Sequence, residues 1–219
     1  MSESKTKTTD PIVFVVDDDD AMRDAVSALM HSAGIACRTY PSAQAFLDAF
    51  TNVEPDVGGG LVLDIRMPGM DGLELQDALT QIGVDLPIVF ISRYGDIPTA
   101  VRAMKGGAMD FLSLPAEAKV LRDRIASALD ADVKRRERRR QLAELQTRTA
   151  TLSPRESEVF ERVATGQANK AIAIDLGISE RTVEIHRSRV MKKMMANNLA
   201  ELVRMKIALD ARWEPVIDL

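Results

Sequence analysis

The chain of 219 residues carries a net charge of −4, and its 46% hydrophobic and 28% charged side chains are typical of a globular protein with one or two domains. Its apolar runs fall short of the roughly 20 residues that cross a bilayer. The polar residues 1–10 are predicted to be a disordered lead without the apolar core of a secretion signal. Cys37 is the only cysteine, which excludes an intrachain disulfide and favours a reducing, cytoplasmic location.

The acidic charge is confined to the first part of the chain. Residues 1–129 hold 11 Lys and Arg against 19 Asp and Glu, whereas residues 130–150 hold 7 against 4 and residues 151–219 hold 11 against 10. This asymmetry predicts two modules with different partners.

Short apolar runs alternate with helical patterns in the first module. Strands are predicted at residues 12–16, 36–40, 60–64, 87–92 and 110–114. Helices are predicted at residues 21–33, 42–50, 71–81 and 97–106, and a further helix begins near Ala116. Five such units indicate an α/β doubly wound five-stranded parallel sheet with helices on both faces, over residues 11–130.

Helical patterns continue through the second half. Residues 131–150 are predicted to form a helical charged linker, in which the basic cluster Arg135–Arg140 is either a solvated helix face or a contact for phosphates or a dimer partner. Residues 151–212 predict an all-α four-helix domain, and residues 213–219 a C-terminal tail. Within this domain, a short helix, a turn and a longer helix over residues 169–194 fit helix-turn-helix spacing.

Acidic residues follow two of the predicted strands. Asp17 and Asp18 end the first strand and Asp64 ends the third. Because ligands of an open parallel sheet gather beyond the carboxyl ends of its strands, we expect these carboxylates to converge. Converging carboxylates suppress one another's ionisation unless a cation offsets them, and Mg²⁺ is the natural cation. Asp19 and Asp20 are expected to cap the next helix instead.

The segments VVDDDD, LVLDIRMPGMDGLEL, IVFIS and DFLSLP resemble the CheY-like receiver domain of two-component response regulators, across about residues 11–130. The resemblance implies that Asp64 accepts phosphate from a sensor histidine kinase, and that Ser92 and Phe111 shift together on phosphorylation. The implied metal ligands are Asp17, Asp18, Asp64 and the backbone carbonyl of Arg66.

Two residues depart from the receiver pattern. Receivers end the fifth strand with a lysine just before a proline, and here Leu114 stands in that place. Leucine neither carries charge nor donates a hydrogen bond. Arg93 follows Ser92, where a small residue is usual. Arg93 is either the cation that replaces the lysine or an exposed side chain unrelated to phosphate.

The longer helix of the predicted helix-turn-helix has two different faces. Val183, Val190 and Met194 share the side that faces a core. The other side is suited to a DNA groove, with base edges and phosphates as its contacts. This side displays Arg181, Glu184, Ile185, Ser188, Arg189 and Lys192.

The segments LSPRESEV, ANKAIAIDLGIS and RTVEIHRSRVMKKM closely resemble a LuxR-type DNA-binding domain, from Leu152 to Met205. By this resemblance Glu184, Ile185 and Ser188 face bases. The residues implied to contact or brace the DNA backbone are Asn169, Lys170, Thr182, His186, Arg187 and Lys192. The last helix forms a dimer interface through Leu199, Leu202 and Val203.

A receiver followed by this domain is the NarL/FixJ architecture, so the first hypothesis is a transcription regulator controlled by phosphorylation of Asp64. Its expected cofactor is Mg²⁺, and its expected partners are DNA, a sensor histidine kinase, RNA polymerase and a second copy in a homodimer, with no membrane. It is expected to be no enzyme beyond its own phosphoryl uptake and loss. The second hypothesis keeps the DNA-binding function but makes the receiver degenerate through Leu114, under the control of a partner or ligand. The third is a phosphatase of the haloacid dehalogenase type, which leaves the helix-turn-helix unexplained.

Overall fold

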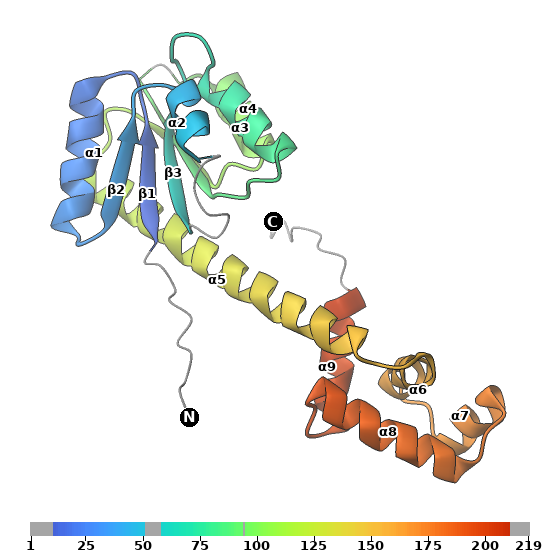
Figure 1. Cartoon of the computed structure of the whole chain (residues 1–219). Helices are drawn as coiled ribbons and strands as arrows, with labels where there is room; N and C mark the ends of the chain where they lie inside the picture. The colour runs from blue at the N-terminus through green and yellow to red at the C-terminus, as the bar shows by residue number, and fades with distance from the viewer. Residues whose placement is uncertain (1–10, 51–57, 94, 211–219) are drawn as a thin grey trace. The chain divides into compact units, whose positions relative to one another are not determined.

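The computed structural model describes residues 11–50, 58–93 and 95–210 (Figure 1). The chain divides into two compact units, Met1–Arg136 and Glu137–Leu219. The expected lead at residues 1–10 and the expected tail at residues 213–219 lie outside the described residues. Within the described ranges, no helix has the length and apolar character to cross a membrane.

The first unit is a five-stranded parallel sheet, as the sequence predicted, and the structure shows its strand order to be β2-β1-β3-β4-β5. Its strands are β1 Ile12–Val16, β2 Ala36–Tyr40, β3 Gly59–Asp64, β4 Ile88–Ser92 and β5 Asp110–Ser113. The helices that alternate with them are α1 Asp20–Ser32, α2 Ala43–Phe50, α3 Gly72–Gln81, α4 Ile97–Lys105 and the first part of α5 Ala118–Ala150.

Both faces of the sheet are covered, which explains why the inner strands are almost continuously apolar. Side chains of α2, α3 and α4 pack against one face around Phe14, Leu63 and Phe90. Side chains of α1 and α5 pack against the opposite face around Val62 and Ile91. Figure 1 shows α1 and α2 on opposite sides of the neighbouring strands β2, β1 and β3.

The strand order places the ends of β1 and β3 together. β1 lies between β2 and β3, so the direction in which the chain adds strands reverses at this point. Val16 pairs with Leu63 in the register of β1 and β3. The next residues along the two strands, Asp17 and Asp64, therefore emerge side by side at the topological switch point.

Helix α5 runs without a break from Ala118 to Ala150, so the expected linker is a continuation of the fifth helix of the sheet. Asp132 is 2% exposed, and its Oδ2 accepts a hydrogen bond of 2.8 Å from the backbone N–H of Gly59. Arg135 and Arg136 lie 2.9 and 3.0 Å from the Asp132 carboxylate. These two arginines do not form a solvated helix face, because both pair with a buried aspartate of their own helix.

Up to Asp210, where the described residues end, the second unit contains four helices after α5, as predicted. They are α6 Pro154–Ala164, α7 Asn169–Leu176, α8 Glu180–Met194 and α9 Leu199–Asp210. Their common core includes Phe160, Ile172 and Val183, all at most 1% exposed. Ser153 and Glu156 form a capping box at the start of α6.

Glu156 is also an electrostatic contact between α6 and α8. Its Oε2 accepts a hydrogen bond from Lys193 Nζ (2.6 Å) and one from the backbone N–H of Ser153 (2.8 Å). The side chain is almost fully buried. The Lys193 ammonium, followed by the Ser153 N–H, lowers the pKa of Glu156 from 4.5 to about 2.

We predict that Glu156→Gln destabilises the second unit at pH 7 by about 1–3 kcal/mol, because Lys193 and the Ser153 N–H lose the charged, nearly buried carboxylate that accepts their hydrogen bonds. Because the pKa of Glu156 is lowered in the folded protein, its ionised carboxylate contributes its full stabilisation above pH 4.5. This contribution to the free energy of unfolding is lost as the pH falls toward 2. Hydrogen exchange of the α6 and α8 amides in the full-length protein measures the difference at each pH. The control Glu158→Gln removes an exposed partner of Arg155 and is expected to change little. A difference between Glu156→Gln and wild type that does not shrink below pH 4 would contradict the prediction.

Candidate acidic site and nucleic-acid interface

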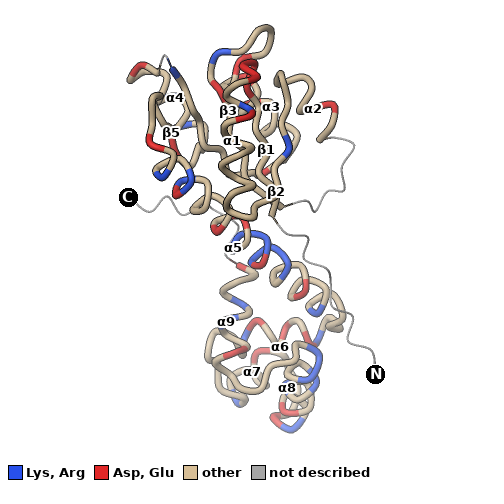
Figure 2. The backbone as a smooth tube through the Cα atoms, turned by 90° about the vertical axis from the view of Figure 1, so that its left-hand side faces the viewer, with Lys and Arg blue, Asp and Glu red and all other residues tan. Residues whose placement is uncertain are grey.

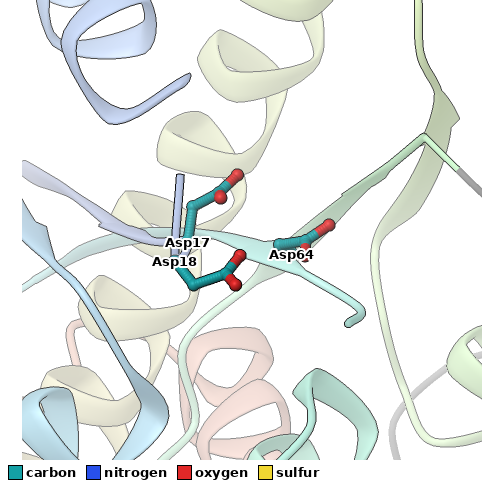
Figure 3. Close-up of side chains that lie close together, drawn as sticks. All are labelled: Asp17, Asp18 and Asp64. Carbon is teal, nitrogen blue, oxygen red and sulfur yellow. The ribbon is translucent and has the colours of Figure 1, made fainter. Parts of the chain in front are cut away.

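Three carboxylates converge at the carboxyl edge of the sheet, as predicted from the strand ends. One carboxylate oxygen from each of Asp17, Asp18 and Asp64 lies within 4.8 Å of the others. Figure 3 shows Asp17 and Asp18 at the end of β1 beside Asp64 at the end of β3. Asp17 is buried, Asp64 is half-buried and Asp18 is exposed.

Burial, with a contribution from neighbouring charges, raises the pKa of Asp17 and of Asp64. Burial, followed by the charge of Asp17, raises the pKa of Asp64 from 3.8 to about 6. Burial is also the largest cause of the raised pKa of Asp17, and the charge of Asp18 adds to it. A cation that binds all three carboxylates offsets the repulsion among their negative charges, and a set of hard oxygen donors fits Mg²⁺.

The loop after Asp64 is built around close backbone contacts. The backbone N–H of Arg66 donates a hydrogen bond of 3.1 Å to Asp64 Oδ2, which brings the Arg66 backbone to the carboxylates. Gly72 begins α3, and a Cβ at this position would lie 2.2 Å from the backbone oxygen of Asp64. Only glycine therefore fits beside the end of β3.

A cavity of about 290 Å³ adjoins the carboxylates. Its lining residues are Asp18, Asp19, Asp64, Arg66, Ser92 and Arg93. Ser92 ends β4 and is buried, so its hydroxyl is held at the wall of the cavity. Phe111 is not among these lining residues: its ring lies 6.4 Å from that of Phe90 and against the backbone of Gly95.

The remaining two aspartates of the DDDD run have separate roles. Asp19 is the N-cap of α1, where its Oδ1 accepts hydrogen bonds from the backbone N–H groups of Ala21 (2.9 Å) and Met22 (3.4 Å). Asp20 is the first residue of α1 and forms an ion pair with Arg23. Of the two residues expected to cap the helix, Asp19 makes the capping hydrogen bonds.

The two departures from the receiver pattern occupy different environments. Leu114 packs against the apolar cluster of Val13 and Val15. Arg93 is exposed, lines the 290 Å³ cavity, and forms an ion pair with Asp19 Oδ2. The sequence did not predict this pair, because Asp19 and Arg93 follow strands that are separated in the sheet by β3.

The second unit presents a polar helix face suited to DNA. Gly177 ends α7 in the left-handed conformation with φ of 65°, which makes the turn into α8. On α8, Val183, Val190 and Met194 are buried, as predicted. The exposed residues of the interface predicted from sequence are Lys170, Arg181, Glu184, Ile185, Ser188, Arg189 and Lys192. Figure 2 shows basic and acidic residues together along α8.

Several of the other predicted interface residues brace the motif. Arg187 donates a hydrogen bond of 2.7 Å to Asn169 Oδ1 and so joins α8 to α7. The Thr182 hydroxyl lies 2.8 Å from the Ser179 hydroxyl at the start of α8. His186 is half-buried, and its Nδ1 has no hydrogen-bond partner among the described residues.

The expected dimer face of α9 needs one correction. Leu202 is fully buried in the core of the second unit, so it is not available to a partner. Leu199 and Ile207 are 41% and 61% exposed, and the half-buried Val203 lies between them at the same four-residue spacing. We call these three residues the α9 stripe. Ile207 was not among the residues expected from the sequence, although its four-residue spacing from Val203 pointed to it.

Two family models match the chain. The response regulator receiver domain matches residues 13–126, and the domain of the bacterial regulatory proteins of the luxR family matches residues 150–206. Nodulation protein W of Bradyrhizobium diazoefficiens is 47% identical over 208 residues, with 95% of this chain and 89% of that protein covered. The transcriptional regulatory protein FixJ of Azorhizobium caulinodans is 43% identical, with 89% of this chain and 91% of that protein covered. Among solved structures, the response regulator StyR has a TM-score of 0.79 at 43% identity, with 91% of this chain and 99% of that chain covered.

The carboxylate cluster predicts a specific effect on metal binding. We expect Asp18→Asn to weaken Mg²⁺ binding by about tenfold or more, since the loss of even an indirect support of a metal ligand costs 10- to 100-fold. Isothermal titration calorimetry of the full-length protein measures the affinity. The matched control is Asp20→Asn, which removes an exposed aspartate of the same run that lies outside the cluster. Equal weakening in both variants would show a general charge effect and no defined site.

Proposed function

The chain belongs to the response regulators of the NarL/FixJ family, in which a receiver domain precedes a LuxR-type DNA-binding domain that regulates transcription, and we propose that phosphorylation of Asp64 controls dimerisation and promoter binding. The observation that carries the proposal is the carboxylate cluster beside the 290 Å³ cavity. This cavity has an acceptor carboxylate on one wall and the Ser92 hydroxyl on another.

The residues of the cavity support phosphoryl transfer. A carboxylate oxygen of Asp64 forms a bond to phosphorus while the bond from phosphorus to the histidine nitrogen of a sensor kinase breaks, and the electron pair stays on that nitrogen. The Ser92 hydroxyl donates a hydrogen bond to a phosphoryl oxygen. Asp17, Asp18, Asp64 and the Arg66 carbonyl would hold Mg²⁺. When bound, this ion offsets negative charge on the phosphoryl oxygens.

Helix α4 supplies an apolar surface for dimerisation of the receiver. Ile97, Val101 and Met104 are 81%, 46% and 46% exposed and share one side of the helix. We call them the α4 stripe. It lies in the segment between β4, which ends at Ser92, and β5, which carries Phe111. A shift of these two residues on phosphorylation would therefore act directly on the segment that carries the stripe.

Dimerisation of the receivers raises the effective concentration of paired DNA-binding domains. The α9 stripe then supplies the contact between those domains on DNA. The exposed side of α8 enters the major groove, with Glu184, Ile185 and Ser188 toward bases. RNA polymerase is the partner through which the bound dimer changes transcription, and the cytoplasm is the compartment.

A second candidate is a degenerate receiver that controls DNA binding without phosphate. Leu114 favours it, because the end of β5 offers an apolar side chain where receivers place a cation. The phosphatase hypothesis has no support, since both units match regulator families.

Beryllofluoride, which mimics an acyl phosphate, separates the two candidates. We predict that beryllofluoride converts the wild-type protein to a dimer, as measured by light scattering, and raises its DNA affinity at least tenfold. The Asp64→Asn variant is expected to show neither change. Val101→Glu places a charge in the α4 stripe and is expected to bind beryllofluoride and remain a monomer. A wild-type protein that binds DNA equally with and without beryllofluoride and Mg²⁺ would favour the degenerate receiver.

The α8 surface predicts how DNA affinity depends on salt. Lys192→Ala is expected to weaken binding to any duplex and to reduce the slope of log affinity against log salt by about one, because one phosphate contact is lost. Fluorescence anisotropy with a non-specific duplex at several salt concentrations measures both effects. Arg155→Ala, which changes an exposed arginine of α6, is the control and is expected to leave the slope unchanged. An unchanged slope in Lys192→Ala would remove this lysine from the interface.

A further inference from the structure

A phosphoryl group on Asp64 would create an uncompensated negative charge in this pocket. Its two negative charges would lie beside Asp17 and Asp18, and a divalent metal offsets only part of this total. Leu114 supplies no cation from the end of β5. Among the described residues that line the cavity, the positively charged side chains are Arg66 and Arg93.

Arg93 lies where a second cation is needed. It follows Ser92 at the end of β4, and its guanidinium is half-exposed at the rim of the cavity. Its first partner is Asp19, and the charges of Asp17 and Asp64 also contribute to the raised pKa of Arg93. The guanidinium therefore already experiences the field of the carboxylates that surround the phosphorylation site.

The two oxygens of Asp19 have separate partners, which makes the ion pair with Arg93 dispensable for the fold. Oδ1 accepts the hydrogen bonds that cap α1, and Oδ2 accepts the guanidinium. Arg93 is thus able to leave Asp19 without breaking the cap. An exposed pair of this kind contributes little to stability.

We propose that Arg93 is the phosphoryl-binding cation of this receiver, held by Asp19 in the resting protein and transferred to the phosphoryl oxygens when Asp64 is phosphorylated. A phosphoryl group competes well for it, because it carries about twice the charge of a carboxylate and accepts two parallel hydrogen bonds from a guanidinium. The inference rests on the proposed function, since it needs a phosphoryl group on Asp64.

The exchange also moves the signal to a different part of the receiver. Asp19 and Arg93 line a second cavity of about 680 Å³, whose other walls are apolar side chains of α1 and of the chain around the start of α5. Leu114 is one of these walls. When Arg93 turns to the phosphoryl group, the Asp19 carboxylate is left without its cation at the edge of this cavity. Phosphorylation is thereby read at the start of α1 as well as through Ser92 and Phe111.

The test uses beryllofluoride affinity of the full-length protein, measured by fluorine NMR at saturating Mg²⁺. We expect Arg93→Gln to weaken binding about tenfold and Arg93→Lys to retain most of it. Asp19→Asn keeps a capping side chain on α1 but releases Arg93, so we expect it to tighten binding severalfold. Arg102→Gln is the matched control, because it breaks an exposed pair with Asp77 that lies outside the cavity, and it is expected to match wild type.

The outcomes separate this inference from the proposed function. If wild type binds no beryllofluoride, the proposed function fails. If wild type binds and Arg93→Gln binds equally well, the phosphorylation site stands and the role of Arg93 is overturned. If Asp19→Asn weakens beryllofluoride binding as much as Arg93→Gln does, the ion pair between Asp19 and Arg93 only supports the local structure. The proposed transfer of Arg93 from Asp19 to the phosphoryl group is then overturned. Mg²⁺ affinity, measured in parallel, is expected not to fall in Arg93→Gln, because a positive charge is removed.

Discussion

The register of β1 and β3 is the constraint on which the rest of the first unit depends. Val16 pairs with Leu63, so the next residues, Asp17 and Asp64, are forced together at the edge of the sheet. Burial and this proximity raise the pKa of Asp64 to about 6. A strand pair that ends in carboxylates is electrostatically unfavourable without a cation, and arginine side chains lie around this one. Arg23 donates a hydrogen bond to the backbone oxygen of Asp17. Arg93 forms an ion pair with Asp19, and both residues line the 290 Å³ cavity.

Most of this site was predictable from sequence, because it depends on local rules. Apolar runs of five residues specify the buried strands, and a parallel sheet brings the residues after those strands to one edge. Asp17, Asp18 and Asp64 followed from these two rules alone. The sequence predicted a cap from Asp19 and Asp20 together. Because α1 begins at Asp20, only Asp19 has an oxygen near the first free N–H groups.

The parts that sequence did not reveal depend on contacts between distant residues. Asp132 belongs to a charge-dense segment that has the pattern of a solvated helix, yet it accepts a hydrogen bond from Gly59, 73 residues earlier. No periodicity predicts such a pairing. Leu202 shows the same limit in α9, because in a helix with apolar residues on several sides only the packing against the other helices of the unit decides which side is buried.

Strand β3 carries at one end a feature that the sequence predicted and at the other end a contact that it did not. Asp64 stands at its carboxyl end, and Gly59 at its amino end donates to Asp132 of α5. The Asp132 carboxylate also binds Arg135, and Arg135 forms a second ion pair with Asp85 in the segment that precedes β4. Asp64 therefore stands at one end of a strand whose other end is hydrogen-bonded to the helix that continues into the second unit. Asp132 is buried, and its carboxylate is held by the Gly59 N–H, Arg135 and Arg136, so this network ties the amino end of β3 to α5.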